Sequence, residues 1–280
     1  MYYYALKIYA ILINNLFIYK EFFFNIHKPN PIKNILFSEK EWWNFLLQKG
    51  PHANGYNTTF SKFAHTNINS YDLVVPLTIP DLEFCMLNEN KLNKNAIPFP
   101  STESFNICND KIMFGDFMEN NGFSEYLPTQ ITENTFPFIL KKKSDEGGEN
   151  TFIIKNYFDI DLHKEAYNSP EYLKQCIVKG EREYTTHIII KDGKILNALT
   201  IVYIFKNPIY IKGKDRYICR NVSKNKHIET FEQILQKMNF NGLCCFNYKE
   251  VNGVPIVLEI NPRFGGSLCN FFYPFLQKVI

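Results

Sequence analysis

Apolar and polar positions in the first hundred residues follow the pattern of a small α/β unit. A short apolar run predicts a strand at residues 34–37, and apolar side chains at helical spacing predict a helix over residues 39–48. A second strand is predicted at residues 71–76, ending at Pro76. Because short apolar strands separated by helical patterns favour parallel pairing, we expect a small parallel sheet. Residues 88–100 then predict a polar linker.

Beyond this linker the pattern predicts one helix and then strands joined by tight turns. The helix covers residues 110–121, with Asn109 or Asp110 as its N-cap and Gly122 at its end. Strands are predicted at residues 136–143, 151–155, 185–191, 194–204, 243–248 and 256–260. Asp192-Gly193 is a strong hairpin signal. An amphipathic helix is predicted over residues 227–238.

Composition describes a globular protein without nucleic-acid chemistry. The 280 residues suffice for one large domain or two of ordinary size, and 45% apolar with 21% charged residues excludes a disordered chain. A net charge of +3 with scattered lysines does not indicate nucleic-acid binding. The seven cysteines are odd in number and include no Cys-x-x-Cys, which argues against a disulfide framework and a zinc site. We therefore expect a cytoplasmic protein; nothing predicts its oligomeric state.

The apolar N-terminal segment has two interpretations. Residues 2–19 are strongly apolar but are interrupted by Lys7, Asn14 and Asn15. A membrane span needs about 20 apolar residues, and a signal peptide has a basic start and a small-residue cleavage site. Since the segment meets neither requirement cleanly, we expect the first strand and helix of a globular domain. A membrane-tethered protein is the alternative.

The candidate chemistry is densest near the C-terminus. Glu259 and Asn261 end an apolar run, and positions two apart in a strand face the same side. A carboxylate and an amide oxygen would therefore lie side by side, with Arg263 as a nearby cation and Gly265-Gly266 allowing close backbone approach. Such oxygens suit Mg²⁺ bridging nucleotide phosphates. The alternative is an ordinary strand end with one surface ion pair.

Three further positions are candidates for nucleotide contacts. Lys141 follows an apolar strand and precedes a glycine-containing loop, which suits a phosphate, although residues 141–143 could also be a solvated basic run. Lys111 begins its helix, where a cation opposes the helix dipole unless it serves another purpose. In residues 175–184 an extended backbone could contact adenine and Glu183 could accept the ribose hydroxyls. The alternative there is an edge strand with surface charges.

In order and spacing these segments resemble the ATP-grasp superfamily, nearest the carbamoyl-phosphate-synthase-like branch of carboxylate–amine ligases. The matching stretches are residues 109–111, 136–141, 175–185 and 242–266. The resemblance implies an α+β fold in which two lobes with antiparallel sheets grip ATP, behind a small Rossmann-like α/β domain. We accordingly expect a pre-ATP-grasp domain at residues 1–104 and an ATP-grasp domain at residues 105–280.

The resemblance also implies roles for individual residues. Lys111 and Lys141 would contact the ATP phosphates, and Glu259 and Asn261 would bind Mg²⁺, or Mn²⁺ in its place. Arg263, with Lys141, would steady the transferred phosphoryl group. The adenine and ribose contacts would come from Gln175, Ile177, Val178 and Glu183. The implied substrates are a small-molecule carboxylate and an amine, joined through an acyl-phosphate.

The chain departs from the family pattern at three places. The strand before Glu259 offers Cys245 or Asn247 where the family has an acidic residue or Gln, and Asn247 is the better Mg²⁺ ligand. The loop at residues 145–149 carries three acids, which would repel phosphate unless they face away. The glycine-rich opening is missing and the chain stops soon after Gly266, which predicts a protein shortened at both ends. An ATP- and Mg²⁺-dependent ligase is the leading hypothesis, and a degenerate nucleotide-binding protein without turnover is the alternative.

Overall fold

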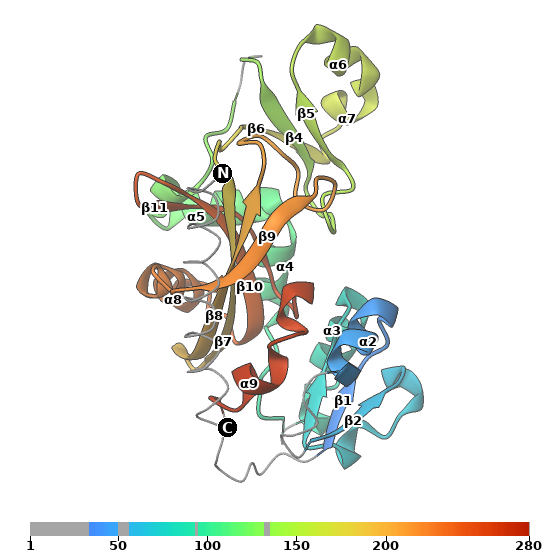
Figure 1. Ribbon diagram of the computed structural model, residues 1–280. Coiled ribbons are helices and arrows are strands. Elements are labelled where there is room, and N and C mark those ends of the chain that lie inside the picture. The colour runs from blue at the N-terminus through green and yellow to red at the C-terminus, as the bar shows by residue number, and fades with distance from the viewer. Residues whose placement is uncertain (1–33, 50–55, 93–94, 132–134, 280) are drawn as a thin grey trace, which may run out of the picture.

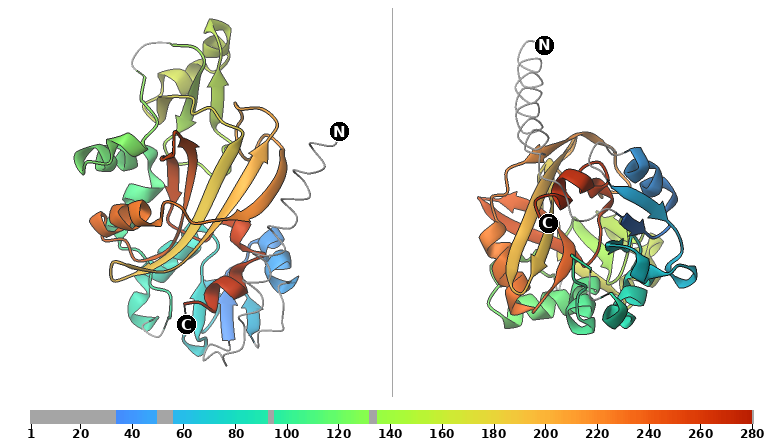
Figure 2. Two further views of the ribbon diagram at one scale, coloured as in Figure 1. Left: turned by 60° about the vertical axis from the view of Figure 1, so that its left-hand side comes forward. Right: turned by 90° about the horizontal axis from the view of Figure 1, so that it is seen from below.

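The computed structural model describes residues 34–49, 56–92, 95–131 and 135–279, which form three β-sheets. The large sheet lies in the middle of the molecule, with a small parallel sheet at one end and a small antiparallel sheet at the other (Figures 1 and 2). The apolar segment at residues 2–19 lies outside the described residues. Within the described ranges, no helix is long and apolar enough to cross a membrane.

The N-terminal unit is the predicted parallel sheet. Strands β1 (Asn34–Phe37), β2 (Asn57–Phe60) and β3 (Leu73–Val75) pair in parallel in the order β2-β1-β3. Successive side chains of β1 point to opposite faces of this sheet and so belong to two different cores. Leu36 packs with Leu82 and Cys85 of α3 (Ile79–Leu87), whereas Ile35 and Phe37 face the other side. The other helices are α2 (Glu41–Lys49) and the 3-10 turns η2 (Phe63–His65), η3 (Ile68–Ser70) and η4 (Glu89–Lys91).

The connection to the rest of the chain is more helical than predicted. The expected linker at residues 88–100 contains η4, and α4 (Thr102–Asn109) follows, where no helix was predicted. The predicted next helix is α5 (Lys111–Asn120), and Asp110 is its N-cap, accepting hydrogen bonds from the backbone N–H of Ile112 and Met113. η5 (Ser124–Tyr126) ends this segment.

The small antiparallel sheet has the strand order β5-β4-β6. Its strands are β4 (Phe138–Lys142), β5 (Thr151–Ile154) and β6 (Tyr172–Cys176). Phe138, Leu140 and Ile154 form its core beneath α6 (Tyr157–Leu162) and α7 (Lys164–Asn168), two helices that the sequence pattern did not predict. The opposite face of this sheet is left to face the large sheet (Figure 1).

The large sheet is antiparallel throughout, in the order β11-β10-β7-β8-β9. Its strands are β7 (Arg182–Lys191), β8 (Lys194–Phe205), β9 (Tyr217–Ser223), β10 (Gly242–Val251) and β11 (Val254–Asn261). The predicted hairpin turn at Asp192-Gly193 is confirmed, with positive φ at both residues.

Each face of the large sheet is covered by a different set of elements. One face packs on α4, α5 and α8 (Ile228–Lys237) through a core that includes Ile188 and Phe231. Ile189, the next residue along β7, lies on the other face. It belongs to a core shared with the parallel sheet, η6 (Gly266–Leu268) and α9 (Phe272–Leu276). The predicted α+β fold of two antiparallel lobes behind a small parallel α/β unit is therefore confirmed.

Candidate functional site

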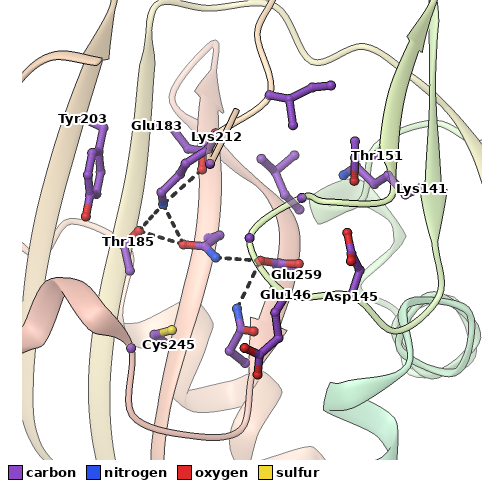
Figure 3. Close-up of a pocket in the computed structure, with 18 of the residues that line it drawn as sticks. Lys141, Asp145, Glu146, Thr151, Glu183, Thr185, Tyr203, Lys212, Cys245 and Glu259 are labelled. Carbon is purple, nitrogen blue, oxygen red and sulfur yellow. Dashed lines mark hydrogen bonds and ion pairs between the residues drawn. The ribbon is translucent and has the colours of Figure 1, made fainter. Parts of the chain in front are cut away.

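A cavity of about 480 Å³ lies between the small antiparallel sheet and the large sheet. Strands β4, β5, β7, β8, β10 and β11 contribute to its walls, as do the β4–β5 and β8–β9 loops. Lys40 and Trp43 of the N-terminal unit line it as well. Figure 3 shows Lys141 and Thr151 of the small sheet across the cavity from Thr185 and Tyr203 of the large one.

Glu259 is the central acid of this cavity. Its Oε1 accepts hydrogen bonds from Asn247 Nδ2 at 2.8 Å and Asn261 Nδ2 at 3.1 Å, and Oε2 is 3.2 Å from Lys111 Nζ. Glu259 and Asn261 thus lie side by side, as their spacing in a strand predicts. Burial alone would raise the pKa of Glu259, but Lys111, Asn261, Lys141 and Asn247 outweigh it and bring the pKa to about 2. The carboxylate is therefore ionised at neutral pH.

Lys141 faces the same carboxylate from the opposite sheet. It sits in β4 and is 8% exposed, and burial lowers its pKa to about 8, partly opposed by Glu259. Lys111 at the start of α5 lowers this pKa further. Among the described residues, no carboxylate lies within ion-pairing distance of Lys141 Nζ. The structure therefore brings Lys111, Lys141 and Glu259 to one place from three distant segments.

Lys212 is a cavity residue that the sequence analysis missed. From the β8–β9 loop its Nζ reaches Glu183 Oε1 at 3.1 Å, Thr185 Oγ1 at 2.6 Å and Asn247 Oδ1 at 3.1 Å (Figure 3). Burial would lower the pKa of Lys212, but Glu183 raises it above its usual value. The only signal in its sequence neighbourhood is Gly213, which directly follows it.

This ion pair changes the interpretation of two predicted site residues. Glu183, expected at the ribose, has one carboxylate oxygen occupied by Lys212. Asn247 Oδ1 accepts hydrogen bonds from both Lys212 and the Thr185 hydroxyl. In this conformation a cation lies beside that oxygen, and the role of Asn247 as a metal ligand stays a prediction. Its amide group orients Glu259.

Of the three residues expected at the adenine, Ile177 and Val178 line the cavity and Gln175 does not. Gln175 is buried in β6 opposite Ile139, and its Oε1 has no hydrogen-bond partner among the described residues. Contact between Gln175 and adenine therefore stays a prediction.

Lys249 is a second lysine whose role the sequence did not predict, and it hydrogen-bonds the backbone just after Ile177. Lys249 Nζ donates to the carbonyl oxygens of Val178 at 2.9 Å and Gly180 at 3.2 Å, and lies 3.9 Å from the Tyr210 ring centroid. Burial lowers the pKa of Lys249 to about 8, with Glu183 opposing it.

The acidic β4–β5 loop turns into the cavity rather than away from it. Asp145 accepts hydrogen bonds from the backbone and side chain of Asn150, which close the loop. Glu146 lines the cavity and pairs with Arg263 Nη2 at 2.9 Å and Lys40 Nζ at 3.5 Å. The acids of this loop were expected to face away from the cavity if it binds phosphate, and in this conformation they do not.

The donors present fit one Mg²⁺ ion shared with a phosphate group. Mg²⁺ in nucleotide sites takes one or two carboxylates and completes its shell with phosphate and water oxygens. Glu259 and Asn261 supply one carboxylate and one amide oxygen, whereas no cluster of three His, Cys, Asp or Glu occurs in the described part of the chain. Burial raises the pKa of Cys245 to about 11, so this residue stays a neutral thiol and a poor Mg²⁺ ligand.

Comparison with known proteins agrees with this geometry. The family model of the ATP-grasp domain matches residues 108–267. D-alanine–D-alanine ligase from Bacillus anthracis superposes with a TM-score of 0.58 at 14% identity, covering 87% of this chain and 90% of that one. The same ligase complexed with ATP gives a TM-score of 0.56 at 13% identity, covering 89% and 95%.

An L-amino acid ligase from Bacillus licheniformis has a similar relation to the chain. Its TM-score is 0.57 at 14% identity, and the match covers 88% of this chain and 70% of that one. No curated protein matches the chain by sequence. At these identities the likeness to solved structures establishes the fold.

Proposed function

We propose that this chain, which belongs to the ATP-grasp family, is an ATP- and Mg²⁺-dependent ligase that joins a carboxylate to an amine. The observation that carries the proposal is the convergence of Lys111, Lys141 and Glu259 on one cavity between two antiparallel sheets. The similar solved structures include ligases named for amino-acid substrates. A small-molecule acid and a small-molecule amine are therefore the proposed partners.

Each part of ATP would contact a different set of residues in the cavity. Lys111 and Lys141 would bind the phosphates, and the backbone at Ile177 and Val178 would contact the adenine. Glu183 would accept the ribose hydroxyls once Lys212 releases it. Lys212 would then be free to approach the phosphates, because its ammonium group already lies inside the cavity.

The proposed chemistry needs alignment and charge neutralisation, and no nucleophile from the protein. A carboxylate oxygen of the acid attacks the γ-phosphorus, the bond to the β–γ bridging oxygen breaks, and ADP leaves. The amine nitrogen then attacks the carbonyl carbon of the acyl-phosphate, loses a proton and expels inorganic phosphate. Lys141 and Arg263 would stabilise charge on the transferred phosphoryl group. Mg²⁺, held by Glu259 and Asn261, would neutralise the phosphate oxygens.

The second candidate function is nucleotide binding without turnover. Two features favour it: the resemblance implies an acidic metal ligand where this chain has Asn247, and Glu146 turns a carboxylate into the cavity. Measuring Mg²⁺-dependent ATP binding, and then ADP release with a panel of amino acids and small acids, separates the two. Binding without ADP release for any acid would support the second candidate, and the absence of ATP binding would exclude both.

We also propose that residues 1–104 are a pre-ATP-grasp domain and residues 105–280 the ATP-grasp domain. Lys40 and Trp43 on the cavity wall support a role for the first of these in binding the acid. Co-expressing residues 1–104 and 105–280 as separate chains tests the division, because one apolar core joins the two parts. The proposal expects the two fragments to associate and bind Mg·ATP, and fragments that do not associate would argue for one inseparable unit.

A further inference from the structure

We propose that Lys40 and Arg263 together bind the carboxylate of the acid substrate, and that Glu146 occupies this position until the acid displaces it. This inference rests on the proposed ligase function and names a substrate-binding residue from the N-terminal unit. It is drawn from the contacts of one loop carboxylate with two cations that lie far apart in the sequence.

Glu146 shows where an external carboxylate would bind. Its Oε1 is 2.9 Å from Arg263 Nη2 and its Oε2 is 3.5 Å from Lys40 Nζ, so a single carboxylate bridges two cations. The Glu146 side chain is 50% exposed. Gly147 and Gly148, which follow it, both have positive φ. A half-exposed side chain on a loop of this kind exchanges more readily than a buried one, because little packing holds it.

Arg263 has unused capacity for an anion. Its side chain is only 9% exposed, and its Nε has no hydrogen-bond partner among the described residues. One of its terminal nitrogens donates to the Phe264 carbonyl oxygen, which fixes the guanidinium plane. A guanidinium group commonly binds a carboxylate in a bidentate manner, through two N–H groups. Glu146 contacts Arg263 only at Nη2, so the bidentate contact is incomplete.

Lys40 is held in place for the same anion. Its Nζ lies 3.9 Å from the centroid of the Trp43 ring. Trp43 in turn packs against Gly266 so closely that a Cβ there would lie 2.8 Å from the ring. Burial lowers the pKa of Lys40, and Glu146 opposes this shift. The glycine pair after Arg263 therefore fixes the ring on which Lys40 rests.

The position of Lys40 in the parallel sheet agrees with ligand binding. It follows the carboxyl end of β1, the central strand in the order β2-β1-β3. The chain passes from β1 to one neighbour and then to the other side, and open parallel sheets bind ligands beside the carboxyl ends of strands at such a reversal. The acid would thus lie between the N-terminal unit and the nucleotide cavity.

The test uses malonate as a carboxylate probe and the full-length protein. Ligand-observed NMR measures malonate affinity without ATP, so the result does not depend on turnover. We expect Glu146→Gln to tighten malonate binding about tenfold, because the competing internal carboxylate is gone. Adding Lys40→Met should reverse this gain, Lys40→Arg should preserve it, and Lys62→Met, at an exposed lysine of the same unit, should change nothing.

Two results would overturn the inference. One is unchanged malonate affinity in Glu146→Gln, and the other is equal affinity in Glu146→Gln with and without Lys40→Met. Circular dichroism of each variant confirms that it is folded. Mg·ATP affinity, measured in the same samples, separates this inference from the proposed function. A parent protein that does not bind Mg·ATP contradicts the ligase proposal, while the malonate series still decides the role of Lys40.

Discussion

Three pairs of opposite charge lie in the cavity, and the two partners of each pair come from different elements. Lys111 pairs with Glu259, Lys212 with Glu183, and Arg263 with Glu146. Buried charges are costly when alone, so this pairing lets ionised groups persist inside the protein. In the proposed function, a nucleotide would bring negative charge to the lysines and would free the acids for a metal ion or for hydroxyl groups. The pairs are therefore suited to exchange partners on binding.

Glu259→Gln should weaken Mg·ATP binding about tenfold or more, because it keeps the shape of the side chain and removes the charge. Isothermal titration calorimetry at fixed Mg²⁺ measures this. Glu250→Gln is the matched control, since Glu250 also contacts basic side chains, Lys226 and His227, but does not line the cavity. If Glu259→Gln bound Mg·ATP as tightly as the parent, the metal assignment would be wrong.

ATP affinity should fall as the pH rises through about 8. Burial lowers the pKa of Lys141 from 10.5 to about 8, so its charged form is present below that pH and is lost above it. ATP binds the charged form, and affinity should drop by up to about tenfold per pH unit above 8.

A pair of variants identifies the titrating lysine. Lys249 also has a pKa lowered to about 8, but its Nζ donates to backbone carbonyl oxygens. Titrations between pH 7 and 9 should lose their pH dependence in Lys141→Met and keep it in Lys249→Met. The opposite pattern would assign the effect to Lys249.

At the scale of elements, two loops meet over the cavity. The β4–β5 loop and the β8–β9 loop touch at Gly147 and Gly213, and a Cβ on Gly213 would overlap the Gly147 carbonyl group. Lys214 Nζ also donates to the Thr151 carbonyl oxygen at 2.8 Å. The loop that supplies Lys212 is therefore fixed to the loop that supplies Glu146.

Gly213→Ala should separate these loops and weaken Mg·ATP binding. The control is Gly253→Ala, because both glycines have positive φ but Gly253 has no atom within 4 Å of a built Cβ. Both substitutions should lower stability by about 1–2 kcal/mol through backbone strain. Thermal melts measure that shared effect, and only Gly213→Ala should also lower nucleotide affinity. Equal affinities in the two variants would show that the contact between the loops is unimportant.

Local signals predicted some elements well and left others undetected. The Asp192-Gly193 hairpin and the helix after Asp110 follow from turn and capping chemistry, which is local. Strand β9 was missed because it is an edge strand with exposed Tyr217 and Ile218, and so lacks a regular apolar alternation. Gln175 does not line the cavity, whereas its neighbours Cys176 and Ile177 do.

The sequence predicted the site only where the candidate residues lie close together along the chain. Glu259 and Asn261 lie two residues apart, and their mutual placement follows from strand geometry. Lys40, Lys212 and Lys249 are single residues among 31 basic ones, with little in their neighbours to distinguish them. Their positions depend on tertiary packing, because each contacts a residue more than 25 positions away.

Across the whole molecule, one apolar core joins the N-terminal unit to the large sheet. Phe37 of β1 lies 5.3 Å from Phe272 of α9, ring centroid to centroid, and Phe264 lies 5.4 Å from the same ring. Ile201 and Phe205 of β8 belong to this core as well. The two parts of the chain are therefore expected to unfold together.

Phe272→Ala should lower the free energy of unfolding by about 3–5 kcal/mol, because it leaves a cavity in the shared core. Urea denaturation followed by circular dichroism should show a single transition shifted to lower urea. Trp42→Ala, at a side chain that is 77% exposed, should change stability by no more than about 0.5 kcal/mol. Two separate transitions in the parent protein would contradict the shared core.

The proposed acid-binding position at Lys40 and Arg263 has a consequence for the synthesis of the protein. The ribosome makes Lys40 early and Arg263 more than two hundred residues later, and Trp43 meets Gly266 only after both have been made. A growing chain that still lacks its last strand and the glycines behind it has no complete position for the acid. Recognition of the acid would then begin only when the two ends of the described chain have met.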